Sequence, residues 1–263
     1  MRFSSDQIQK IGKEISSKVD GKTLFDEFSR GRYSTDASVY QIKPLGVVLP
    51  KDTNDVLNLM EYSQKNSIPL LARGGGSSQC GQTVGESVVL DYSKHQNKIL
   101  ELNVEEKYVW VQPGVVLDHL NSFLRPYGLW FPVDVSTSSR ATIGGMSANN
   151  SCGSRSLYYG NMVHNVLAIE AILDDGSLHT FDQINKNYLT TTNNQDRFYK
   201  IIDKFLNLRQ KVSKDIDENW PTTQRRVGGY NIDLIDPNGF NSSNLLVGSE
   251  GTLSLFNLSL IHI

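Results

Sequence analysis

Residues 70–78 (Leu-Leu-Ala-Arg-Gly-Gly-Gly-Ser-Ser) carry the clearest sign of chemistry in this chain. Apolar residues run into Arg73, and the three glycines and two serines after it form a turn that few side chains could enter. Glycine tolerates φ > 0 and leaves the backbone open to a ligand, and successive N–H groups in such a turn can converge on an anion. The segment predicts a pyrophosphate cradle; a tight turn without a ligand is the alternative reading.

Two familiar phosphate-binding patterns do not fit this segment. The spacing from Gly76 to Gly81 comes within one residue of a P-loop, but Gln82 stands where that motif needs its phosphate-binding lysine. The glycines are also not spaced as G-x-G-x-x-G, and no strong helical pattern opens after them. We therefore expect a diphosphate that is neither an NTPase substrate nor bound in a Rossmann crevice.

Two more glycine-rich elements follow along the chain. Residues 142–153 contain Gly144-Gly145 and then small residues that can begin a helix, and a hydroxyl-rich stretch at 131–139, fixed by Pro132, precedes them. Residues 248–252 (Gly-Ser-Glu-Gly-Thr) form the third element, after Leu245-Leu246-Val247. The stretches 142–153 and 131–139 each read equally well, taken alone, as a polar surface loop. Together with residues 70–78 they make three elements bounded by strands of buried type, which suit a long, bent, dinucleotide-like ligand.

Composition narrows the class of protein. The 263 residues are 38% hydrophobic and 21% charged with a net charge of −2, which fits a globular domain and gives no electrostatic footprint for nucleic acid. No apolar run is long enough for a membrane span, and the N-terminus lacks the pattern of a signal peptide, so we expect a cytoplasmic protein. Cys80 and Cys152 are expected to be free thiols, and the five histidines show no spacing for a metal site.

The elements that must position these turns can be read from hydrophobic periodicity. Residues 5–30 predict one or two helices. A β-α-β unit with one more strand is expected over 46–91, which favours parallel pairing in a helix-covered sheet. Beyond it the sequence predicts strands at 99–102, 108–112, 166–173 and 177–181, and helices near 115–125 and 196–212.

Six short segments of the chain, taken in series, resemble the FAD-binding domain of FAD-linked oxidases of the vanillyl-alcohol oxidase / p-cresol methylhydroxylase type. Within that family the chain is most similar to bacterial D-lactate, glycolate and D-2-hydroxyglutarate dehydrogenases. The segments run in family order over about residues 36–256: Arg73-Gly-Gly-Gly-Ser-Ser, Gln112-Pro-Gly-Val, Phe131-Pro-Val-Asp, Ala141-Thr-Ile-Gly-Gly, Asn149-Asn-Ser-Cys-Gly and Gly248-Ser-Glu-Gly-Thr-Leu.

The resemblance implies an α+β fold of two subdomains, a small β-α-β one and a larger one with a mixed or antiparallel sheet and flanking helices, with FAD between them. The implied layout is a helical extension at 1–35, an FAD-binding domain at 36–257 (subdomains about 36–95 and 98–257), and the truncated start of a following segment at 258–263. The implied cofactor-binding residues are Arg73, Gly74, Gly75, Gly76, Ser77, Ser78, Pro132, Asp134, Ser136, Ser138, Gly144, Gly145, Asn149, Asn150, Gly153, Val166, Glu250 and Gly251.

The resemblance further implies oxidation of a 2-hydroxy acid by hydride transfer to flavin N5, with an electron acceptor that it does not identify. Ser77 and Ser78 stand where some members carry a histidine that attaches FAD, so binding should be non-covalent. No catalytic base or metal ligand is assigned; His164 alone lies near the glycine turns. The chain is expected to be an N-terminal fragment, inactive without a substrate domain, and segment 225–231 resembles enzymes that also carry an iron–sulfur module. A non-catalytic flavin-binding subunit and a UDP-N-acetylenolpyruvoylglucosamine-reductase-type enzyme remain as alternatives.

Overall fold

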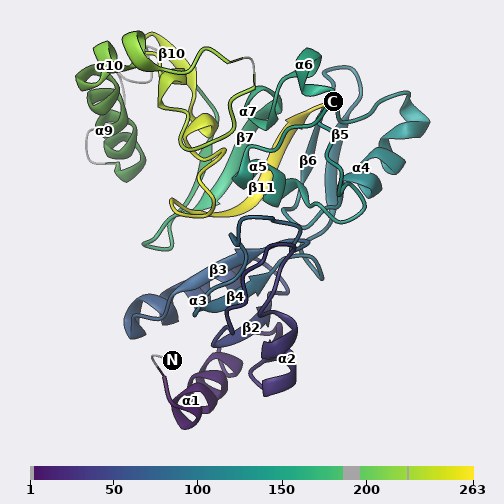
Figure 1. Cartoon of the computed structure of the whole chain (residues 1–263), viewed down its shortest axis with the longest axis vertical. Helices are drawn as coiled ribbons and strands as arrows, with labels where there is room; N and C mark the ends of the chain where they lie inside the picture. The colour runs from purple at the N-terminus through teal and green to yellow at the C-terminus, as the bar shows by residue number, and fades with distance from the viewer. Residues whose placement is uncertain (1–2, 186–195, 224) are drawn as a thin grey trace.

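A computed structural model describes residues 3–185, 196–223 and 225–263. It has two main sheets, one below the other in Figure 1, joined by loops at the middle of the molecule. The first sheet has the order β1-β2-β4-β3, in which β2 and β3 both pair in parallel with β4 and β1 pairs antiparallel with β2. Its elements are α1 (Ser5–Ser16), β1 (Lys22–Leu24), α2 (Glu27–Arg32), β2 (Gly46–Leu49), α3 (Thr53–Asn66), β3 (Leu70–Arg73) and β4 (Val88–Asp91).

Local sequence explains why the first sheet forms as it does. Asp52 caps α3 by accepting hydrogen bonds from the amides of Asn54 and Asp55, and Ser67 ends that helix in the left-handed conformation. The strands β2 and β4 are buried throughout, as expected of parallel strands covered on both faces. The predicted β-α-β unit and its parallel pairing are confirmed.

The second sheet is antiparallel throughout, with the order β5-β6-β11-β7-β8. A separate two-stranded sheet, β9 with β10, lies beside it and was not predicted. The elements of this half are β5 (Ile99–Asn103), β6 (Tyr108–Val111), α4 (Leu117–Leu124), η1 (Arg125–Tyr127), α5 (Ile143–Asn149), α6 (Ser156–Tyr159), α7 (Met162–Asn165), β7 (Val166–Ile172), β8 (Leu178–Phe181), β9 (Gln183–Asn185), α9 (Arg197–Lys211), α10 (Ser213–Asn219), η2 (Ile232–Leu234), β10 (Gly239–Asn241), η3 (Ser242–Leu245) and β11 (Leu255–His262).

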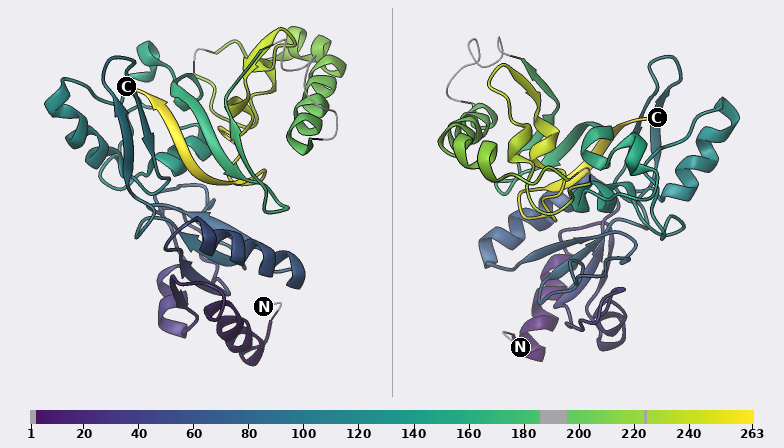
Figure 2. Two further views of the ribbon diagram at one scale, coloured as in Figure 1. Left: turned by 180° about the vertical axis from the view of Figure 1, so that it is seen from behind. Right: turned by 45° about the horizontal axis from the view of Figure 1, so that its top comes forward.

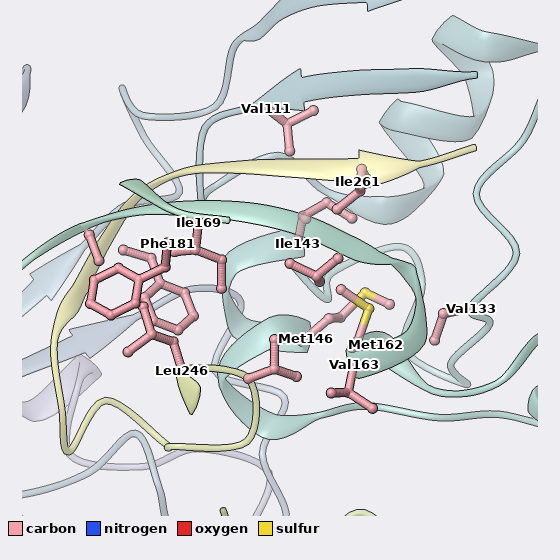
Figure 3. Close-up of a cluster of buried hydrophobic side chains, with 14 of the residues drawn as sticks. Val111, Val133, Ile143, Met146, Met162, Val163, Ile169, Phe181, Leu246 and Ile261 are labelled. Atoms are coloured by element: carbon pink, nitrogen blue, oxygen red, sulfur yellow. The ribbon is translucent and has the colours of Figure 1, made fainter. Parts of the chain in front are cut away.

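The main core lies between the second sheet and the short helices α5 and α7. Figure 3 shows Ile143 and Met146 of α5 facing Ile169 of β7 and Ile261 of β11. Each of these side chains is at most 2% exposed, and burying such a side chain contributes about 1.5–3 kcal/mol. This packing holds the second glycine-rich element against the sheet.

The two halves of the molecule share apolar contacts. Ile172 and Leu255 belong to the second sheet, yet they pack in the core of the first half with Leu90 and Tyr92. A hydrogen bond of 2.7 Å from Thr53 Oγ1 to Asn257 Oδ1 joins the halves at the same place. The views in Figure 2 show the first half extending away from the second sheet beneath this junction.

One expectation from sequence needs correction. The stretch 5–30 contains the strand β1 as well as helices, because the short segment 22–24 completes the edge of the first sheet against β2. The run 242–245 before the third glycine-rich turn forms the 3₁₀ helix η3. Residues 258–262 belong to β11, which starts at Leu255 and lies between β6 and β7. The expected domain limits stay a prediction.

Candidate cofactor-binding site

A cavity of about 460 Å³ opens where the loops of the two sheets meet, a volume within the range of small-molecule and cofactor sites. All three glycine-rich elements contribute to its wall. Of the residues predicted for the site, the wall includes Arg73, Gly74, Gly75, Gly76, Ser77, Ser78, Ser136, Gly144, Gly145, Asn149, Asn150, Glu250 and Gly251. The three turns, separated by more than 170 residues from first to last, are therefore brought to one hollow.

The first glycine turn is held directly against the second glycine-rich element. A Cβ atom placed on Gly74 would lie 2.1 Å from Thr142 Oγ1, and one on Gly75 would lie 2.2 Å from the carbonyl oxygen of Arg140. Gly76 has φ +64°, a backbone conformation that favours glycine. Close approach of two protein segments thus explains two of the three glycines, which sequence reasoning attributed to the ligand.

Arg73 lines the cavity but directs its charged end into the protein. Its Nη1 donates to the carbonyl oxygen of Thr83 at 3.0 Å and its Nη2 to that of Thr35 at 2.8 Å. The guanidinium also lies 5.3 Å from the ring centroid of Tyr33. Burial lowers the pKa of Arg73, partly offset by Asp91 and Asp36. The geometry is that of a brace between the segment before β2 and the loop after the glycine turn.

The second element forms α5, capped by Thr142, whose Oγ1 accepts from the amide of Gly145 at 3.3 Å. Asn150 ends the helix in the left-handed conformation and is fully buried. Its Oδ1 accepts from the amide of Val163 at 3.0 Å, and its Nδ2 is buried with no partner within the described chain. Asn150 is one of the residues that line the cavity. That donor suits a ligand acceptor.

The third turn is fastened to α5. The amide of Gly248 donates to the carbonyl oxygen of Ser147 at 3.0 Å, and the amide of Glu250 donates to that of Ala148 at 2.9 Å. The Glu250 carboxylate accepts from Asn149 Nδ2 at 2.7 Å and from Gln82 Nε2 at 3.4 Å. Because Gln82 belongs to the loop after the first glycine turn, Glu250 connects all three elements around the cavity.

Five predicted residues do not line the cavity: Pro132, Asp134, Ser138, Gly153 and Val166. The Asp134 carboxylate instead accepts from Ser154 Oγ at 2.7 Å and from the amide of Arg155 at 3.0 Å. A Cβ on Gly153 would lie 2.1 Å from the carbonyl oxygen of Asp134. The backbone of Val166 is also used internally, since its carbonyl oxygen accepts from Asn241 Nδ2 at 2.9 Å. Their assignment to the cofactor stays a prediction.

Sequence reasoning missed several residues of the wall. Tyr92, Thr142, Ser254 and Phe256 line the cavity, as do both free cysteines, Cys80 and Cys152. A signal for Tyr92 was present, because it follows β4 and the carboxyl ends of the parallel strands β3 and β4 must meet at one edge. Ser254 carries no comparable signal.

His164, the histidine nearest to the glycine turns in sequence, has a structural role. Its Nδ1 accepts from the amide of Asn161 at 3.0 Å in a capping interaction of α7. No histidine of the described chain lines the cavity. Among the residues that the structure covers, no group of three or more His, Cys, Asp or Glu side chains is placed to hold a metal ion.

Comparison with known proteins identifies the family. The profile described as FAD binding domain matches residues 44–182. The chain is 37% identical over 237 residues to a D-2-hydroxyglutarate dehydrogenase of Haemophilus influenzae, covering 84% of this chain and 22% of that protein. It is 34% identical over 244 residues to a D-2-hydroxyglutarate dehydrogenase of Escherichia coli, covering 89% and 24%. It is also 34% identical to the glycolate oxidase subunit GlcD of Bacillus subtilis, covering 65% and 37%.

The chain thus spans less than a quarter of the two dehydrogenases. Among solved structures, alkyldihydroxyacetonephosphate synthase superposes with a TM-score of 0.67 at 18% identity, covering 97% of this chain and 40% of that one. That likeness supports the fold. None of the helices in the described ranges has the length and apolar character needed to cross a bilayer. The expected α+β architecture and the expected cofactor are confirmed, and the chain belongs to the FAD-binding domain family of flavoproteins.

Proposed function

We propose that this chain is the cofactor-binding part of a flavoprotein that oxidises a 2-hydroxy acid of the D-2-hydroxyglutarate, D-lactate or glycolate class. Convergence of the three glycine-rich elements on one cavity carries the proposal. The names of the related enzymes support the substrate class. Because those relatives are much longer, the proposal concerns a protein to which this chain contributes the cofactor site.

The residues of the cavity fit FAD. Asn150 Nδ2 is a hydrogen-bond donor without a partner in the described chain. The diphosphate and carbonyl oxygens of FAD are acceptors that could pair with it. The backbone from Gly74 to Ser78 would hold the diphosphate, and the α5 and Glu250–Gly251 segments would close around the rest. Bound FAD would supply the redox chemistry by accepting a hydride from the substrate α-carbon at N5, while the protein positions and insulates it. Ser77 and Ser78 occupy the positions where some family members carry the histidine that attaches FAD, so we expect non-covalent binding.

A general base must lie within hydrogen-bond reach of the substrate hydroxyl. Among the residues that the structure describes, the cavity wall carries one carboxylate, that of Glu250, and it already accepts from Asn149 and Gln82. We therefore propose that the groups which bind the substrate carboxylate and take the proton of its hydroxyl are not in this chain. By itself the chain is expected to bind FAD without oxidising a hydroxy acid.

An absorbance titration tests the proposal. The 263-residue chain, freed of flavin, should develop structured flavin bands with one equivalent of FAD, and heat or acid should release them. Anaerobic addition of D-2-hydroxyglutarate, D-lactate or glycolate to the longest available form of the protein should bleach the bands. Bleaching by NADPH alone would favour the reductase reading, and FAD binding without bleaching by any of these compounds would favour a binding subunit. A folded chain that stays colourless contradicts the proposal.

A further inference from the structure

Two residues that line the cavity carry buried hydroxyl groups with no hydrogen-bond partner among the residues described, and neither is a predicted cofactor-binding residue. The hydroxyls are Tyr92 Oη and Ser254 Oγ. The two side chains are 4% and 7% exposed, so solvent does not hydrate them freely. A buried hydroxyl without a partner opposes folding, whereas an apolar side chain of the same shape does not. Their presence at this wall therefore needs a reason other than stability.

The two residues come from different halves of the molecule. Tyr92 directly follows β4 of the first sheet, and Ser254 directly precedes β11 of the second. Tyr92 packs in one apolar cluster with Leu255, the neighbour of Ser254. The two residues thus belong to the part of the cavity wall where the two sheets meet.

Close packing surrounds the Tyr92 side chain. A Cβ on Gly114 would lie 2.2 Å from the carbonyl oxygen of Tyr92, so the following segment presses closely on its backbone. The surrounding cluster includes Leu90 and Ile172, which bury the ring. Burial also raises the pKa of the Tyr92 hydroxyl above its ordinary value of 10.0, so the group keeps its proton at neutral pH and can donate.

We infer that Tyr92 and Ser254 are hydrogen-bonding ligands of the bound FAD, one from each sheet. The inference rests on the proposed occupancy of this cavity by FAD. The cofactor offers carbonyl, hydroxyl and phosphate oxygens as acceptors, and pairing with them relieves both buried hydroxyls. FAD then joins the two halves of the protein through these groups as well as through the glycine turns.

Removing each hydroxyl without changing shape tests the inference. Tyr92→Phe and Ser254→Ala should weaken FAD binding about three- to tenfold each, as loss of one hydrogen bond predicts. Without FAD, both variants should melt at or above the temperature of the parent chain, because an unpaired polar atom has been removed. The dissociation constant is measured by quenching of flavin fluorescence, and the melting temperature by circular dichroism.

Tyr62→Phe is the matched control. Tyr62 is buried in the same half of the molecule, but its hydroxyl donates to Glu14 at 2.6 Å, away from the cavity. This variant should melt lower than the parent and keep the FAD affinity of the parent. The control therefore shows the signature of a hydroxyl with an internal partner.

Three results overturn the inference. Unchanged FAD affinity in both variants shows that the hydroxyls do not contact the cofactor. A lower melting temperature without FAD, as in Tyr62→Phe, shows that they have a partner inside the protein, such as a buried water. A folded parent chain that binds no FAD overturns the proposed function as well, and this outcome is distinct from the other two.

Discussion

A Cβ atom on Gly74 would lie 2.1 Å from Oγ1 of Thr142, so the first glycine turn and the N-cap of α5 touch where no side chain fits. The same Oγ1 accepts from the amide of Gly145. The turn comes from the first sheet and the helix packs on the second. This contact therefore sets the distance between the two walls of the cavity.

Gly74→Ala should destabilise the protein by about 1–3 kcal/mol, the usual cost of overpacking, and should lower FAD affinity by displacing the turn. Urea unfolding and FAD titration measure the two effects. Gly31→Ala is the control, because Gly31 lies in α2 with no heavy atom within 4 Å of its would-be Cβ. That change should stabilise the helix by about 0.5–1 kcal/mol and leave FAD binding unchanged.

Combining Gly74→Ala with Thr142→Ala tests whether this one contact causes the effect. Thr142→Ala alone should cost about 1 kcal/mol by removing the helix cap. In the double variant the clash with Oγ1 is gone, so the loss should be smaller than the sum of the single losses by about 1 kcal/mol or more. If the losses of unfolding free energy were strictly additive, the strain in Gly74→Ala would come from a contact other than the one with Thr142 Oγ1.

The meeting of these two segments could not be predicted from sequence. The triple glycine predicted a turn, and Thr142 before Ile143-Gly144-Gly145 was compatible with a helix start. Local patterns of this kind reveal elements, but the close approach of Gly74 to Thr142 depends on how two separate sheets pack. The glycines were consequently attributed to a ligand when part of their requirement is contact within the protein.

Arg73→Lys should destabilise the protein by about 1–3 kcal/mol, because a lysine cannot donate to the carbonyls of Thr35 and Thr83 in the fork geometry of a guanidinium. FAD affinity measured at several salt concentrations should keep the salt dependence of the parent chain. If the variant instead unfolds like the parent and binds FAD with a weaker dependence on salt, Arg73 acts as a counter-ion of the diphosphate, which would agree with its place among the implied cofactor-binding residues.

Asp134 shows a similar limit of sequence reasoning. Its position in the Phe131-Pro-Val-Asp segment indicated the cofactor, and the structure places its carboxylate against Ser154 and the amide of Arg155. A carboxylate in a hydroxyl-rich loop carries no local signal of which partner it meets. Tyr92 is the opposite case, since its position at the end of a parallel strand was a signal for the site that sequence reasoning missed.

Asp134→Asn should show how this carboxylate contributes to stability with pH. Although burial acts to raise it, the hydrogen bonds from Ser154 and Arg155 hold the pKa of Asp134 below its ordinary value of 3.8. A lowered pKa in the folded state gives a contribution that is present above 3.8 and is lost as the pH falls through the folded value. The variant should therefore be less stable at pH 7, by up to about 1 kcal/mol.

The difference in unfolding free energy between parent and Asp134→Asn should shrink towards zero as the pH falls below 3.8. Urea unfolding at a series of pH values measures it. FAD affinity at pH 7 should stay that of the parent, because Asp134 does not line the cavity. A large loss of FAD affinity with unchanged stability would instead show that Asp134 contacts the cofactor.

Gly251 offers the sharpest comparison, because Gly176 is its structural match outside the cavity. Their φ angles are +75° and +79°, and a Cβ on either would meet no heavy atom within 4 Å. Alanine at each position should therefore cost a similar amount, about 1 kcal/mol, for adopting a positive φ. Gly251 alone lines the cavity, so its open space is the space that FAD would occupy.

Gly251→Ala and Gly176→Ala should thus lower the melting temperature equally when no FAD is present. Only Gly251→Ala should also weaken FAD binding, by about tenfold or more if the new methyl group stands in the path of the cofactor. Thermal melts with and without FAD separate the two contributions, since bound cofactor stabilises the folded state in proportion to its affinity. Equal FAD affinity in the two variants would place the cofactor away from the third glycine turn, and with it remove the reason for the three turns to meet at one cavity.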